Sequence, residues 1–225
     1  MDARERSFLE QTQRYHASGG DLDALVRVYF EGDGGVRIRE YKYPRGVTRL
    51  HHAAREGWCA AITWLLEQGA DVHVGCPLHG GTPLQAAANK GVCDVAVLLF
   101  DAGARVTDCD KSWQTALHYA ASHGCLKMCQ LLVSHGASLD ARDIAGYSPK
   151  AYARIYGKTT TTAFLAAVRA AGGWRAYCDA QFRDLRRELL APGTTAESSE
   201  RLYERVFVEL PNAVFPRVLA FRPDF

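Results

Sequence analysis

The sequence predicts an all-α solenoid, made of stacked helix-turn-helix units that are joined by short finger loops. The first observation is an internal repeat, because the segment TRLHHAA at residues 48–54 recurs as TPLQAAA at 82–88 and as TALHYAA at 115–121. The second is the spacing, since the copies begin at Thr48, Thr82 and Thr115 and so lie 34 and 33 positions apart. One helix pair cannot bury its apolar face alone, so a fixed period predicts a stack that shares one core.

The start of each unit carries a helix signal. A threonine hydroxyl can accept a hydrogen bond from a backbone N–H one turn further on, so the three threonines are predicted to cap the first helices. Pro83 follows its threonine directly, at the helix position where a missing N–H costs nothing. The paired alanines let neighbouring helices approach closely. The leucine two positions after each threonine should face the next layer, at Leu50, Leu84 and Leu117.

Glycines mark the ends of both helices in each unit, where a residue in the left-handed conformation is favoured. Those expected after the first helices are Gly57, Gly91 and Gly124, and those after the second helices are Gly69, Gly103 and Gly136. The apolar runs at residues 62–66, 95–99 and 128–132 are predicted to be the buried faces of the second helices.

The Thr-Pro-Leu-His-x-Ala lettering and the period near 33 resemble the ankyrin-repeat family. The resemblance covers residues 46–173, and three clear repeats are expected at 46–78, 79–111 and 112–144. A fourth, degenerate repeat follows, in which Lys150 replaces the core leucine and residues 159–171 supply the second helix. The resemblance also implies that two histidines bridge backbone groups of adjacent repeats, namely His51 and His118.

Residues 1–45 are interpreted as a degenerate N-terminal capping repeat, since the end of a stack faces water. A helix is expected from Glu5 to Ala17. A second helix is expected to begin at Asp21, because apolar residues then follow at helical spacing: Leu22, Leu25, Val26 and Tyr29. Residues 36–43 are expected to form a finger that leads into the first clear repeat.

Residues 174–225 leave the period and are predicted to form a helical C-terminal extension. An amphipathic helix is expected over 174–190, with a linker rich in helix-breaking residues at 191–195. Because the ends of a solenoid need covering, this extension is interpreted as a helical C-terminal cap.

The end of the chain allows a second interpretation. The segment from Leu210-Pro211 to Phe221 resembles the opening of an F-box, although Pro216 falls inside the expected helix and should kink it. This resemblance implies a docking element for the adaptor of a ubiquitin ligase. A cap and a docking element both remain open for this extension.

Composition argues against several functional classes. The formal charge of +2 gives no reason to expect a nucleic-acid partner. No apolar run reaches the roughly 18 residues that suggest a membrane span. Seven cysteines without paired-motif spacing are expected to be free thiols and not metal ligands. They predict a reducing interior, so the location is expected to be cytoplasmic, with the nucleus left open.

No catalytic arrangement stands out in the sequence. Residues 157–159 (GKT) imitate the end of a phosphate loop, but that motif needs a glycine where the chain has Tyr152. His51 and His118 are not accompanied by the nucleophile or carboxylate pattern that a catalytic role would need. The sequence therefore predicts a non-enzymatic protein with no cofactor and no metal.

A protein-binding surface is the remaining prediction. Solenoids bind partners on extended concave surfaces, and in the ankyrin family the finger tips and first helices line that surface. The expected function is a protein–protein interaction scaffold, and the alternative is a substrate receptor of a ubiquitin ligase. The candidate partner-binding residues are Arg55, Glu56, Leu78, His79, Asn89, Lys90, Lys111, Trp113, Gln114, Ser122, His123, Tyr147 and Tyr156, with Arg45, Val47 and Ile155 beside them.

Trp113 is the most informative candidate. The equivalent finger positions hold Gly46, Gly80 and Gly146, so a bulky residue there is costly if its φ is positive. A large aromatic residue on a finger tip is typical of an interface anchor, and folding back onto a neighbouring finger is the alternative. Leu78, Trp113 and Tyr147 are expected to form a row along one edge of the concave face.

Overall fold

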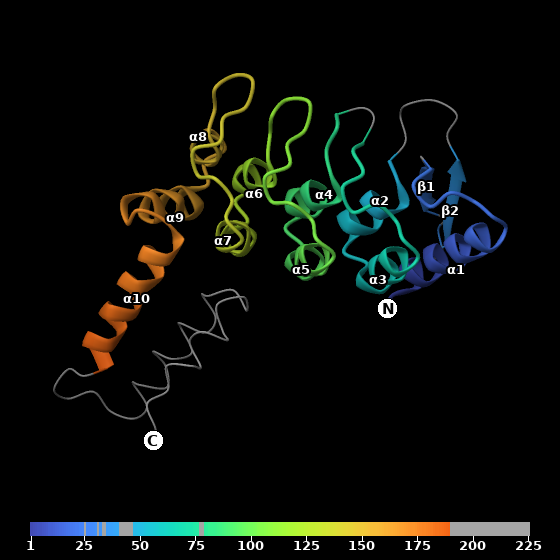
Figure 1. The fold of residues 1–225 in the computed structure, drawn as a ribbon, viewed down its shortest axis with the longest axis horizontal. Coiled ribbons are helices and arrows are strands. Elements are labelled where there is room, and N and C mark those ends of the chain that lie inside the picture. Colours follow the sequence, from blue (N-terminus) through green and yellow to red (C-terminus); the bar gives the residue numbers. More distant parts are fainter. Residues whose placement is uncertain (25, 31, 33–34, 41–46, 77–78, 190–225) are drawn as a thin grey trace.

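The computed structural model describes residues 1–24, 26–30, 32, 35–40, 47–76 and 79–189. Within these residues the chain forms an elongated stack of helix pairs with one small hairpin near its N-terminal end (Figure 1). The first helices are α2 (Arg49–Glu56), α4 (Pro83–Lys90), α6 (Ala116–His123) and α8 (Pro149–Ile155). The second helices are α3 (Cys59–Glu67), α5 (Cys93–Asp101), α7 (Leu126–Ser134) and α9 (Thr159–Ala170). The predicted all-α helical solenoid is confirmed.

Local signals place the ends of the first helices. The Thr82 hydroxyl accepts a hydrogen bond from the backbone N–H of Gln85 at 3.4 Å, and the Gln85 side chain accepts one from the Thr82 N–H at 2.8 Å. This reciprocal capping box satisfies two backbone donors that a helix start leaves without partners. Gly57, Gly91 and Gly124 end α2, α4 and α6 in the left-handed conformation, with φ of 83°, 76° and 77°.

The core runs through the whole stack without a break. The repeat leucines of the first helices are fully or almost fully buried, at Leu50, Leu84 and Leu117. The second helices add Ile62, Leu65, Val95, Leu99, Met128 and Leu132 to the same core. Lys150 is only half-buried, and α8 itself buries just Pro149 and Ala153, so the first helix of the fourth repeat is less embedded, as predicted.

The N-terminal end differs from its prediction in one element. Helix α1 (Ala3–Ala17) forms as expected, but the helix predicted after Asp21 is wrong. Instead β1 (Val26–Phe30) pairs antiparallel with β2 (Val36–Glu40), so that Val26 lies opposite Glu40. Strand β2 also replaces the first part of the expected finger over 36–43. The physical reason is that alternating β-branched residues on both sides of a glycine-rich segment of the sequence favour a hairpin over a helix.

The hairpin is joined to both of its neighbours by hydrogen bonds. The Val26 N–H donates to the Val47 carbonyl at 2.8 Å, which ties β1 to the segment entering α2. On the other side the Gln11 amide of α1 donates to the Val36 carbonyl, and its oxygen accepts from the Ile38 N–H at 3.2 Å. Helix α1 and the hairpin therefore form one unit at this end of the stack.

Buried polar side chains connect this unit to the first repeat. Glu5 of α1 is buried, and its carboxylate accepts hydrogen bonds from the N–H groups of Ala60 and Ala61 at 2.9 and 3.3 Å. It thereby caps α3, whose own N-terminal residue makes no side-chain cap. Arg49 of α2, only 1% exposed, lies 4.0 Å from the centre of the Tyr15 ring and donates to the Asp21 carbonyl.

At the other end, α10 (Trp174–Leu189) packs on α9 through its first turns. Phe164 of α9 lies 6.2 Å from the ring of Trp174 and 5.7 Å from that of Tyr177, and Cys178 is buried. Further along, α10 runs away from the stack (Figure 1). The expected linker and the F-box-like segment lie outside the described residues, so the role of the extension stays a prediction.

We expect Leu117→Ala to lower the free energy of unfolding by about 2–5 kcal/mol, because Leu117 is fully buried and its truncation leaves a cavity. Stability in a stack is shared between neighbours, so amide exchange should rise across α4 to α8 and not in α6 alone. Chemical denaturation and hydrogen exchange measure both effects. Val97→Ala, at a side chain 40% exposed on α5, is the control with a small effect. Exchange confined to α6 would contradict the shared core.

Candidate protein-binding face

The fingers are held in register by backbone hydrogen bonds between neighbours. The Lys111 N–H donates to the His79 carbonyl at 2.8 Å, and the Ile144 N–H donates to the Ser112 carbonyl at 3.0 Å. Three successive fingers are therefore linked edge to edge. We refer to the surface formed by the finger tips and by α2, α4, α6 and α8 as the inner face.

A side chain from each first helix also bridges to a finger. The His51 Nε2–H donates to the Gly81 carbonyl at 2.7 Å, and the His118 Nε2–H donates to the Tyr147 carbonyl at 3.1 Å. Gln85 occupies the same helix position and donates to the carbonyls of Asp108 and Gln114 at 3.1 and 2.9 Å. The bridging role that the family resemblance implied for the two histidines is confirmed.

The bridges define the protonation of both histidines. A carbonyl oxygen can only accept, so Nε2 carries the proton, and Nδ1 of His118 accepts from the Thr115 N–H at 3.1 Å. Burial lowers the pKa of His51 and of His118 below the usual value of 6.5. Both side chains are therefore neutral at pH 7, and both ring nitrogens of each are held in hydrogen bonds.

Two aspartates inside the fingers organise the turns, and the sequence analysis missed them. The Asp110 carboxylate accepts from the N–H groups of Ser112 and Gln114 at 2.9 and 2.8 Å, and from the Tyr119 hydroxyl at 2.6 Å. The Asp143 carboxylate repeats this pattern 33 positions later, with the Tyr152 hydroxyl at 2.7 Å. The repeated signal was an aspartate in each finger and a tyrosine nine positions further on.

The contact between Asp143 and Tyr152 also shifts the pKa of both side chains. Burial and then the hydrogen bond to Asp143 raise the pKa of Tyr152 to about 12. Burial would raise the pKa of Asp143, but hydrogen bonds from Tyr152 and from two backbone N–H groups outweigh it and lower that pKa. Both finger carboxylates thus serve the turns of their own repeats.

Trp113 lies at the end of such a turn. Its φ is 59°, and among the described residues it is the only non-glycine with a positive φ. Gly80 and Gly146, at the equivalent positions, have φ of 73° and 80°. The tryptophan side chain is 62% exposed, which argues against the alternative that it folds back onto a neighbouring finger.

The other candidate residues fall into three groups. Arg55, His79, Lys90, Lys111, His123, Tyr147, Tyr156 and Ile155 are exposed. Glu56, Asn89, Gln114, Ser122 and Val47 are half-buried. Leu78 and Arg45 lie outside the described residues, so the expected row of Leu78, Trp113 and Tyr147 stays a prediction. Gln114 is already engaged, since its amide donates to the Tyr152 hydroxyl at 2.5 Å.

A further exposed apolar residue, absent from the predicted set, lies on the finger next to that of Trp113. Ile144 is 67% exposed, and its backbone is bonded to Ser112, the residue before Trp113. Tyr147 follows on the same finger and is 46% exposed. The third and fourth fingers therefore present three large apolar side chains to solvent.

Charges are unevenly distributed between the two sides of the stack. Among the described residues of the inner face, the exposed charged side chains are basic: Arg55, Lys90, Lys111, Arg142 and Arg154. The carboxylates of this face are engaged, with Glu56 3.3 Å from Arg55 and the two finger aspartates in their turns. The second helices and the loops after them expose charges of both signs, with carboxylates at Glu67, Asp71, Asp94, Asp101 and Asp140 and basic side chains at Arg105, Lys127 and Arg169.

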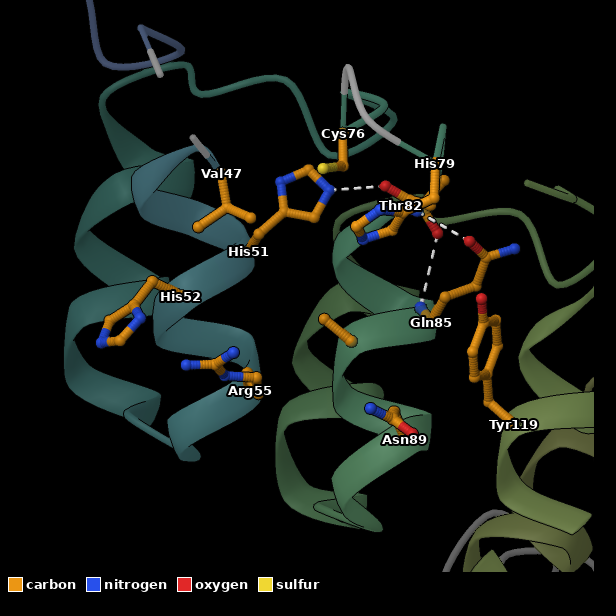
Figure 2. Close-up of a pocket in the computed structure, with 12 residues that line it drawn as sticks. Val47, His51, His52, Arg55, Cys76, His79, Thr82, Gln85, Asn89 and Tyr119 are labelled. Carbon is orange, nitrogen blue, oxygen red and sulfur yellow. Dashed lines mark hydrogen bonds between the residues drawn. The ribbon is translucent and has the colours of Figure 1, made fainter. Parts of the chain in front are cut away.

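A pocket of about 160 Å³ opens on the inner face between α2 and α4, next to Tyr119 of α6 (Figure 2). Figure 2 shows Arg55 and Asn89 toward one end, and His51, Cys76 and His79 toward the other. In the part of the chain that the structure describes, no cluster of histidine, cysteine or carboxylate side chains has the makings of a metal site.

A family model described as ankyrin repeats, in three copies, matches this chain at residues 15–110, 50–143 and 94–170. The chain belongs to the ankyrin-repeat family. Ankyrin repeats indicate a protein–protein interaction module. Over the described residues, none of the helices combines the length and the apolar character needed to cross a bilayer.

Individual relatives share the repeats but differ in their overall size. The chain is 32% identical over 139 residues to the B-cell lymphoma 3 protein homolog of Mus musculus, covering 62% of this chain and 30% of the relative. It is 35% identical over 100 residues to ankyrin repeat and SOCS box protein 11 of Danio rerio, covering 44% and 33%. It is 40% identical over 86 residues to probable E3 ubiquitin-protein ligase XBOS33 of Oryza sativa subsp. japonica, covering 38% and 16%. The matches therefore span about a third or less of each relative.

The titration of His52 makes the free energy of unfolding depend on pH. It is buried, with its ring 5.8 Å from that of Phe8 and 5.2 Å from that of Trp58, so it links α2 to the N-terminal unit. Burial and then the nearby charge of Arg55 lower its pKa to about 4. The unfolded chain, with a histidine pKa near 6.5, binds this proton more readily than the folded chain.

We expect the free energy of unfolding to be highest above pH 6.5 and to fall as the pH is lowered toward 4. His52 alone should account for about 3 kcal/mol of that loss, and His51 and His118 should add to it. Urea denaturation at several pH values between 7 and 4 measures the slope. His52→Phe, which keeps a ring but does not titrate, should make the slope shallower. An unchanged slope in this variant would contradict the assignment.

Proposed function

We propose that this protein is a non-enzymatic interaction scaffold that binds a partner protein on the inner face, the face expected to be concave. The observation that carries the proposal is Trp113, an exposed tryptophan held in a conformation that glycine adopts without cost. A backbone conformation of this kind costs about 1–3 kcal/mol in a non-glycine residue and is concentrated at functional sites. The structure retains a strained residue whose side chain supports no core, which favours a role in contact with a partner.

The surroundings of Trp113 support the same proposal. Ile144 and Tyr147 add exposed apolar area on the next finger, and large aromatic anchors dominate the energy of protein interfaces. The exposed basic side chains of α2, α4 and the third finger lie on the same inner face, and the carboxylates of that face are already engaged. A partner segment with apolar anchors and several acidic residues would complement this face. The proposed location is the cytoplasm, where free thiols persist.

We expect Trp113→Gly to separate binding from stability. Removing the indole should weaken partner binding by more than about 2 kcal/mol, while relief of the positive φ leaves the melting temperature unchanged or raised. The partner can be captured with a photo-crosslinking residue at position 144, which keeps Trp113 in place, with position 97 on the second helix α5 as control. Calorimetry then compares the wild-type chain with the variant.

Arg55→Ala measures how much one exposed charge of the inner face contributes to partner binding, for comparison with Trp113→Gly. It should weaken binding less than Trp113→Gly and act mainly on the association rate, because exposed charges steer a partner more than they hold it. Stopped-flow or surface binding at two salt concentrations measures this. A large stability loss in Trp113→Gly with unchanged partner affinity would show that Trp113 is structural and would overturn the proposal.

A second candidate function is a substrate receptor of a ubiquitin ligase. Two relatives favour it by name, the SOCS box protein of Danio rerio and the probable E3 ubiquitin-protein ligase of Oryza sativa. The F-box-like segment at 210–221 would supply the docking element, with the repeats holding the client.

This candidate predicts that the full chain recovers ligase adaptor subunits from cell extract. Leu210→Asp in the full chain should abolish that recovery, because the segment would lose an apolar anchor, while Trp113→Gly should leave it intact. Immunoblotting of affinity-purified samples measures both. Recovery that is equal in the wild type and in Leu210→Asp would contradict docking through this segment.

A further inference from the structure

The pocket in Figure 2 exists because one side chain is small. Ala86 of α4 occupies the helix position that Tyr119 holds in α6 and Tyr152 holds in α8, 33 and 66 positions further on. Those tyrosines extend from their helices to the aspartates of their own fingers. In the second repeat the sequence has Pro77 at the aspartate position, so both members of the pair are replaced together. The space that a tyrosine would fill is left open to solvent.

Several polar side chains that line this pocket already have hydrogen-bond partners within the chain. The ring of His51 uses both nitrogens, with the Thr48 hydroxyl at 2.8 Å and the Gly81 carbonyl at 2.7 Å. The Tyr119 hydroxyl is engaged with Asp110, and the Gln85 amide with two finger carbonyls. With these polar groups engaged, the parts of the wall formed by Ala86 and by the rings of His51 and Tyr119 favour an apolar group.

At one end of the pocket, the side chains of Arg55 and Asn89 can donate hydrogen bonds to a ligand. Arg55 uses Nε in its contact with Glu56, and its side chain is 48% exposed, so its terminal nitrogens can reach a ligand. The half-buried Asn89 of α4 also lines the pocket, toward the same end in Figure 2, and the exposed Lys90 is the next residue on α4. Arginine binds a carboxylate through two parallel hydrogen bonds, so this end favours an anion over a neutral group.

The volume of the pocket indicates that an aromatic ring is an apolar group it can hold. A cavity of about 150 Å³ lined by apolar side chains accommodates a benzene ring, and this pocket measures about 160 Å³. We propose that the pocket is a specificity site, which takes one aromatic side chain of the partner segment with a neighbouring carboxylate on Arg55. This inference rests on the proposed function and names a feature of the partner: an aromatic residue next to an acidic one.

A capped dipeptide, N-acetyl-Phe-Glu-amide, is the probe that tests this site on the full chain. In ¹H–¹⁵N correlation spectra it should produce saturable shifts at His51, Ala86 and Asn89, with a dissociation constant in the millimolar range. Ala86→Tyr, which introduces the residue type of the next two repeats, should weaken binding by about tenfold or more because it fills the pocket. Arg55→Gln should weaken it by about three- to tenfold.

Matched probes and variants make the result decisive. N-acetyl-Ala-Glu-amide lacks the ring and should not bind, and Ala86→Leu offers a smaller blocking side chain if Ala86→Tyr does not fold. Trp113 does not line the pocket, so Trp113→Gly should leave probe binding unchanged. Absence of saturable shifts, or equal shifts in both Ala86 variants, would overturn the specificity site. A partner still captured at position 144 would then show that the proposed function stands without it.

Discussion

In each of the three clear repeats, the side chain at the third position of the first helix forms a hydrogen bond to the next finger. His51, Gln85 and His118 all occupy this position, and each donates a hydrogen bond to a finger carbonyl. A buried carbonyl without a partner would cost about 1–3 kcal/mol, so these bonds strongly favour one spacing between repeats. The shared leucine core supplies most of the burial energy, but the bridges set the register in which that core is packed.

The rigidity of the fingers follows from these bridges together with the finger aspartates. Asp110 accepts hydrogen bonds from two backbone N–H groups of its own turn, and the turn closes through a hydrogen bond from the Trp113 N–H to the Asp110 carbonyl. A turn that is held by this many contacts can retain a residue with positive φ, because relaxing Trp113 would break several bonds at once. The same contacts use up the acidic groups of the inner face and leave its basic groups exposed.

Predictions from the sequence period were correct for features that depend on residues close together in the chain. The threonine caps of α2 and α4 and the glycine ends of α2, α4 and α6 depend on residues within one helix turn of each other, and the structure confirms them. The repeat leucines recur with the same period, and they are buried in each copy. The hairpin β1–β2 was missed because Leu22, Leu25, Val26 and Tyr29 fit a helical spacing by coincidence. Two β-branched strands on either side of a glycine-rich turn were the stronger signal, and hydrogen bonds to Gln11 and Val47 hold the strands in place.

The sequence by itself determined the type of the repeat and the side of each first helix that is buried, since a period of 33 with local capping leaves little choice. Only the tertiary structure revealed that Glu5 caps a helix 55 positions away, that Trp113 has a positive φ and stays exposed, and that Ala86 leaves a pocket beside Arg55. Each of these depends on which neighbours lie against a residue in space. Contacts between separate repeats, and not the pattern within one repeat, decide what those neighbours are.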